Sequence, residues 1–225
     1  MGVELRNDID RPLFEGLDPA RATAVRALIA TAKAAGAETI SLIPRNDGTG
    51  LGNGERQANL RVAMKAILPM LQDAALVALV EPLGFQRSSL CAKAELVDTI
   101  AGIEGAGSFK LVHDTFHHTL AGSGLFYPEF TGIVHISGVI DPALGIKDME
   151  DEHRVLVDED DRLGNIPQIH ALTKVGYAGP VSYECFSLQT HALADPFAQI
   201  KRSFEFIAFS YADRGSFITR EQRSA

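Results

Sequence analysis

Short runs of apolar residues alternate with longer amphipathic stretches along the chain. The short runs predict strands and lie at 3–6, 39–43, 75–80, 110–113, 132–134 and 181–183. Most of these runs are apolar at consecutive positions rather than at alternate ones. That pattern is typical of strands in a parallel sheet that is covered by helices.

The amphipathic stretches predict helices over 18–35, 55–71, 88–103, 166–175 and 196–209. The first helix has clear ends, because Asp18 suits the N-cap, Pro19 suits the first helical position and Gly36 stops the pattern. The polar stretch 141–164 predicts a loop, and 210–225 predicts a polar C-terminal tail.

The repeated strand–helix order predicts an α/β fold of the TIM type, a (β/α) barrel. A closed barrel of this type has eight strand–helix units, whereas about six are recognisable here. We therefore expect a barrel that is incomplete on its N-terminal side. No linker-like segment divides the chain, so residues 1–225 are expected to form one domain.

Charge and composition exclude several classes of partner. The chain of 225 residues carries a formal net charge of −8, which argues against nucleic acids and anionic membranes. No apolar run approaches the roughly 20 residues of a membrane span, and the N-terminus lacks a signal-peptide pattern. The two cysteines do not form a disulfide framework, which indicates a reducing compartment, and we expect the cytoplasm.

Residues able to bind a metal follow four of the predicted strands at their carboxyl ends. They are Glu81, Asp114, His135 and Glu184. In a parallel barrel these ends meet at one mouth, where active sites lie. Three converging carboxylates repel one another, and a divalent cation relieves that repulsion. Oxygen ligands with one imidazole favour Mn²⁺, with Mg²⁺, Co²⁺ or Zn²⁺ as alternatives.

A metal held in this way can polarise the carbonyl of a keto-polyol and stabilise the enediolate that follows proton removal. Glu81 and Glu184 would flank the substrate, so that one removes a proton and the other returns it. His117 and His153 would bind hydroxyl groups or steady the enediolate. The predicted partner is thus a small polyol or keto-sugar.

Each of these residues also has a simpler interpretation. A single glutamate at a strand end is most often a surface residue, and His135 alone fits a core histidine. His113 and His118 are expected to be structural, because residues beside Asp114 in a strand point to the helix-covered face. Only the four strand ends taken together indicate a site, since no single one of them would.

Five segments of the chain resemble the xylose isomerase-like barrel superfamily of sugar isomerases and epimerases, and most closely the inosose isomerase-like proteins of inositol catabolism. They are 80–85 (VEPLGF), 111–118 (LVHDTFHH), 134–139 (VHISGV), 151–157 (DEHRVLV) and 179–186 (GPVSYECF). The resemblance implies that the same four residues hold the metal. It also implies that His117 contacts substrate, and we expect His153 and Arg154 to contact substrate as well. In related apurinic endonucleases an Asp-x-His pair binds zinc, and Asp151 and His153 have that spacing.

The N-terminal half departs from the family pattern. Residues 3–8 resemble the second strand of the family, so we expect this sequence to lack the first strand–helix unit and also the third. An open barrel exposes strand edges that invite pairing, which predicts a homo-oligomer.

Three functions remain open at this stage. The first is a metal-dependent isomerase or epimerase acting on an inosose or related keto-polyol. The second is an inosose dehydratase-type lyase, which begins with the same proton abstraction. The third is a truncated barrel that binds a metal or a polyol without turnover.

Overall fold

Six parallel strands form one open, curved sheet, as the sequence predicts. The computed structural model describes residues 4–6, 19–47 and 52–221. The strands are β1 (Glu4–Arg6), β2 (Thr39–Ile43), β3 (Val77–Val80), β4 (Phe109–Asp114), β5 (Thr131–Ile136) and β6 (Val181–Tyr183). They lie in sequence order, and every neighbouring pair is parallel.

The barrel is incomplete, because its first and last strands do not meet. Among the described residues β1 pairs with β2 and β6 pairs with β5, and each has one open edge. The expected N-cap at Asp18 and the start of the first strand at Val3 lie outside the described residues. The open sheet still places the carboxyl ends of β3 to β6 side by side.

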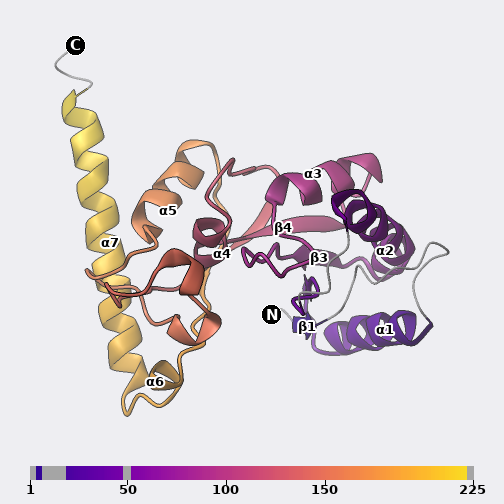
Figure 1. Cartoon of the computed structure of the whole chain (residues 1–225), viewed down its shortest axis with the longest axis horizontal. Coiled ribbons are helices and arrows are strands. Elements are labelled where there is room, and N and C mark those ends of the chain that lie inside the picture. Colours follow the sequence, from indigo (N-terminus) through magenta and orange to yellow (C-terminus); the bar gives the residue numbers. More distant parts are fainter. Residues whose placement is uncertain (1–3, 7–18, 48–51, 222–225) are drawn as a thin grey trace.

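Helices cover the convex face of the sheet in two groups. Figure 1 shows α1 (Pro19–Ala34), α2 (Asn53–Ala74) and α3 (Lys93–Gly102) at one end, and α5 (Asn165–Lys174) and α7 (Pro196–Glu221) at the other. The short helices α4 (Thr115–Leu120) and α6 (Leu188–His191) follow β4 and β6.

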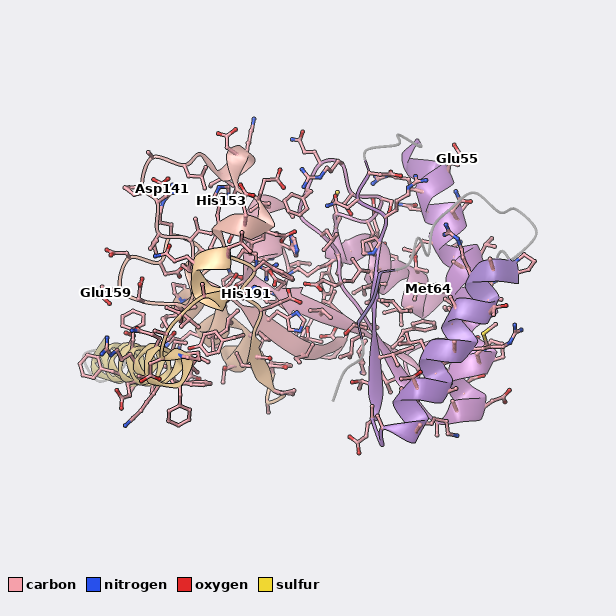
Figure 2. The ribbon with its side chains drawn as sticks, turned by 90° about the horizontal axis from the view of Figure 1, so that it is seen from below. Glu55, Met64, Asp141, His153, Glu159 and His191 are labelled. Carbon is pink, nitrogen blue, oxygen red and sulfur yellow. The ribbon has the colours of Figure 1, made fainter. Side chains whose placement is uncertain are left out.

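The largest core cluster lies between the first helix group and the sheet. The predicted apolar face of the second helix is buried: Met64 and Ile67 are inaccessible to solvent and belong to the same cluster as Ile40 and Val80. Figure 2 shows Met64 on the inner side of α2. A smaller cluster joins Val134 and other residues of β5 to α5 and α7. Burial of such side chains contributes about 1.5–3 kcal/mol each.

Two predicted helix boundaries are wrong. The third helix begins at Lys93 rather than near residue 88, because Ser88 and Ser89 serve the preceding loop: the Ser88 hydroxyl bonds to Leu90 and the Ser89 hydroxyl to the Arg45 carbonyl. The last helix continues to Glu221 instead of ending at residue 209, so most of the predicted tail is helical.

The predicted loop 141–164 is confirmed apart from two 3-10 turns, η1 (Ile146–Asp148) and η2 (Asp151–His153).

Candidate metal centre

The four residues predicted as ligands lie together at the carboxyl ends of four neighbouring strands. One ligand atom from each of Glu81, Asp114, His135 and Glu184 lies within 4.8 Å of the others. The strand register produces this cluster, because Asp114 pairs directly with His135. Backbone bonds fix the other two, since Glu81 N–H donates to Leu42 O and Glu184 N–H donates to Ile136 O.

The side chains in this cluster are close together and largely buried. Glu81 and Asp114 are 2% and 3% exposed. His135 Nδ1 lies 3.2 Å from Glu184 Oε1 and 3.6 Å from Glu81 Oε1. Within the described part of the chain, Glu81 Oε1 and His135 Nδ1 are buried and lack a hydrogen-bond partner. Unsatisfied buried polar atoms of this kind fit a divalent metal ion with oxygen and imidazole ligands.

Asp114 is held ionised and in place by two groups. Its Oδ1 accepts a hydrogen bond of 2.8 Å from His117 N–H, so the carboxylate also caps the N-terminus of α4. Its Oδ2 accepts from Arg154 Nη2 at 2.5 Å. Burial alone would raise the pKa of Asp114, but Arg154 and then His117 oppose it and lower the pKa to about 2.

Arg154 links two of the candidate ligands. Its guanidinium is fully buried and donates to Asp114, to Glu184 Oε2 at 2.9 Å and to Asp151 Oδ1 at 3.2 Å, while Nε donates to Ser137 Oγ at 3.0 Å. Two aromatic rings lie against the guanidinium, with centroids 4.9 and 5.0 Å from its carbon, those of Phe116 and Phe186. With a divalent ion bound, the formal charges of the ion, the three carboxylates and this guanidinium would sum to zero.

The three residues predicted to contact substrate, His117, His153 and Arg154, lie in three different surroundings. His117 is buried against the rings of Phe85 and Phe116, and its Nδ1 has no partner among the described residues. His153 lies on η2 in the loop region, where Figure 2 labels it, and its Nδ1 accepts from Glu150 N–H. Arg154 contacts Asp114 and Glu184, two of the four candidate ligands. Substrate contact by these three residues stays a prediction.

The sequence analysis did not single out Ser137 or Lys93, and it named Asp151 only for its spacing from His153. Ser137 lies two positions after His135 at the end of β5, and this spacing was the available signal. Asp151 lies three positions before Arg154, a spacing that suits an ion pair. Lys93 was also missed, and it contacts His113 and His118 on the other face of the sheet, where both histidines were predicted to point.

Metal binding at this centre is expected to release protons. Burial, and then the charge of Glu184, raises the pKa of Glu81 to about 7. Burial would lower the pKa of His135, but Glu184 and Glu81 outweigh it and raise the pKa to about 11. The metal-free centre therefore holds a proton on His135 at pH 8, and a second on Glu81 below pH 7.

Calorimetric titration with Mn²⁺ in buffers of different ionisation heat measures this release. We expect about one proton per ion at pH 8 and nearly two at pH 6, so that affinity falls as the pH falls. Binding that releases no protons at either pH would contradict the assignment of His135 and Glu81 as ligands.

Comparisons with known proteins identify the family and the fold of this chain. Residues 14–208 match the family model described as "Xylose isomerase-like TIM barrel". A xylose isomerase domain-containing protein from Salmonella typhimurium is 27% identical, with a TM-score of 0.78, over 93% of this chain and 75% of that one. No match was found among the curated proteins.

Two further solved structures share the fold at lower identity. An IolI protein with a bound zinc atom is 18% identical with a TM-score of 0.77, over 88% of this chain and 74% of that one. An L-ribulose 3-epimerase is 19% identical with a TM-score of 0.68, over 100% of this chain and 78% of that one. Among the described residues, no helix has both the length and the apolar character needed to cross a bilayer.

Proposed function

The chain belongs to the xylose isomerase-like TIM barrel family, and from this premise we propose that it is a metal-dependent isomerase or epimerase of a keto-polyol. The observation that carries the proposal is the convergence of Glu81, Asp114, His135 and Glu184 within 4.8 Å. Structural neighbours that are named as sugar epimerases support the reaction class. We further propose an inosose as substrate, on the sequence resemblance alone.

The donor set supports the proposal of divalent metal dependence. We propose Mn²⁺ as the physiological ion, because three carboxylates and one imidazole suit it better than an all-oxygen or thiolate site would. Zinc is the main alternative, since the IolI neighbour carries it. When bound, the ion would polarise the substrate carbonyl and so acidify the adjacent C–H.

We propose that Glu81 and Glu184 move the proton. They follow β3 and β6, the outermost of the four strands that carry ligands, and His135 lies close to both. A substrate carbon held between them would present one face to each carboxylate. Removal of the proton by one glutamate and return by the other would invert or relocate the C–H bond.

Proton NMR in D₂O tests this function with a panel of inososes and ketohexoses. We expect a product with the same number of oxygens as the substrate and with deuterium at the carbon next to the carbonyl. A product that has lost water would instead assign the dehydratase-type lyase, which shares the first step. If the protein binds a metal or a polyol but exchanges no C–H proton for deuterium in any inosose or ketohexose tested, its function would be that of a non-catalytic binder.

We also propose that the chain self-associates through its open side. Both β1 and β6 have a free edge among the described residues, and free edges favour pairing with another chain. Apolar side chains are exposed nearby on β6 and on the helices after it, including Val181 (41%), Leu188 (81%) and Phe204 (54%). A cytoplasmic location remains a further prediction.

Light scattering of the purified protein is expected to give at least twice the mass of one chain. The Val181→Lys variant is expected to lower that mass, because a lysine on the free edge of β6 opposes strand pairing. Gln72→Lys, at an exposed position of α2, adds the same charge in the other helix group and serves as the control. A monodisperse monomer at micromolar concentration would refute the self-association.

A further inference from the structure

Lys93 lies on the face of the sheet opposite the carboxylate cluster. It begins α3, and its Nζ lies 2.7 Å from His118 Nδ1 and 3.0 Å from His113 Nδ1. His113 precedes Asp114 in β4, so its side chain points away from the face that carries the ligands. The Lys93 cluster, which we define as Lys93, His113 and His118, plays no part in the proposed proton transfer.

The cluster holds an amine without an acidic partner. None of the ion pairs among the described residues includes Lys93. His113 Nε2 lies 3.0 Å from Gln168 Oε1, and an amide oxygen only accepts, so Nε2 carries the hydrogen and Nδ1 accepts from the amine. Burial lowers the pKa of Lys93 to about 7, although the charge of Asp114 partly opposes this. Two neutral acceptors within hydrogen-bond distance, with no carboxylate in an ion pair with the amine, favour an uncharged, nucleophilic amine.

A cavity of about 310 Å³ opens beside this amine. Its wall includes Lys93 and His118, with Cys91, Leu125 and Tyr127 around them. The volume suits a small organic molecule. Asp114 and His117 also line the cavity, so it adjoins the candidate metal centre. Gly84 also lines the cavity and packs closely against α4, because a Cβ there would lie 2.2 Å from His117 O.

We propose that Lys93 forms an imine with a small aldehyde or ketone that binds in this cavity. The nitrogen lone pair makes the C–N bond while the carbonyl π electrons move to oxygen. The two N–H protons pass to that oxygen, with His118 Nδ1 as the carrier at 2.7 Å. The oxygen leaves as water and the C=N bond forms, so that no oxidant or reductant is required.

Reductive trapping with propanal and cyanoborohydride at pH 7.5, followed by peptide mass spectrometry, tests the proposal. At this pH an amine with a pKa near 7 is mostly free, whereas an ordinary lysine is almost entirely protonated. Because lower basicity offsets part of that gain, we expect Lys93 to be labelled roughly tenfold faster than exposed lysines. Lys65, Lys147 and Lys174 are exposed and serve as internal controls.

Two further readouts separate a binding site from simple reactivity. The labelling rate of Lys93 is expected to level off as propanal concentration rises, while the rates of the control lysines stay linear. His118→Gln is expected to slow labelling of Lys93 several-fold in a protein whose far-UV circular dichroism is unchanged. Glu184→Gln is expected to leave labelling unchanged, so this test is independent of the proposed isomerase activity.

Labelling of Lys93 at the rate of the exposed lysines would overturn the proposal. A rate that stays linear in propanal would overturn the binding site in the cavity. An unchanged rate in a folded His118→Gln protein would overturn the role of His118.

Discussion

Replacing Glu184 by glutamine is expected to reduce proton exchange at the substrate carbon by about 10²–10⁴-fold. The amide cannot accept the proton that the carboxylate would take, yet its oxygen can still contact the ion. Most metal binding is therefore expected to survive, because Glu81, Asp114 and His135 remain. Exchange into D₂O and the metal content of the same preparation measure the two properties separately.

A matched variant shows whether the effect belongs to the centre. Glu152 lies in the same part of the fold, but its side chain is 79% exposed. Glu152→Gln makes the same chemical change without touching the cluster and is expected to leave exchange unchanged. Full exchange activity in a metal-loaded Glu184→Gln protein would remove Glu184 from the catalytic role.

Replacing Arg154 by methionine is expected to lower the free energy of unfolding by about 3–5 kcal/mol, because it leaves buried carboxylates without their partner. Arg154 donates to both Asp114 and Glu184, and its side chain is 1% exposed. Urea unfolding of the metal-free protein measures the loss. The loss is expected to shrink when Mn²⁺ is added, since the ion neutralises the same carboxylates and stabilises the folded state.

The ion pair between Arg87 and Glu150 supplies the comparison. Both side chains are about two-fifths exposed, at 40% and 42%, and such surface pairs contribute about 0–1 kcal/mol. Arg87→Met is therefore expected to cost far less than Arg154→Met. Equal losses in the two variants, or a loss at Arg154 that Mn²⁺ does not reduce, would show that Arg154 does not neutralise the metal ligands.

Most of the strand pattern and the clustering of the four strand-end residues were predictable from the sequence. The signal is a charged or ionisable residue that directly follows a short strand-forming run, as at Asp114 and Glu184. Parallel pairing then brings strand ends together whatever the details of packing. This is why residues that are about a hundred positions apart could be placed in one cluster without coordinates.

The place of Arg154 could not be predicted in the same way. It lies in a polar loop without periodicity, far along the chain from Asp114, and arginine in such a loop is usually exposed. Its burial depends on how the loop folds over the strand ends and brings the guanidinium against Phe116 and Phe186. The cluster at Lys93 escaped prediction for a related reason, because it joins α3 to β4 and α4 through side-chain contacts.

Helix ends depended on hydrogen bonds that hydrophobic spacing does not encode. Ser88 and Ser89 look like helix-starting residues, yet their hydroxyls bond within the loop and to Arg45. At the other end, the change from apolar to polar residues after Phe209 suggested a tail. No proline follows to stop the helix, and it continues to Glu221.

The proposed chemistry depends on one divalent ion held by four side chains on neighbouring strands. Crystals of the protein grown with MnCl₂ and measured for anomalous scattering test this binding most directly. We expect one strong peak at about 2.0–2.3 Å from atoms of Glu81, Asp114, His135 and Glu184. A peak bound elsewhere, or none at these residues at saturating Mn²⁺, would contradict the existence of the centre.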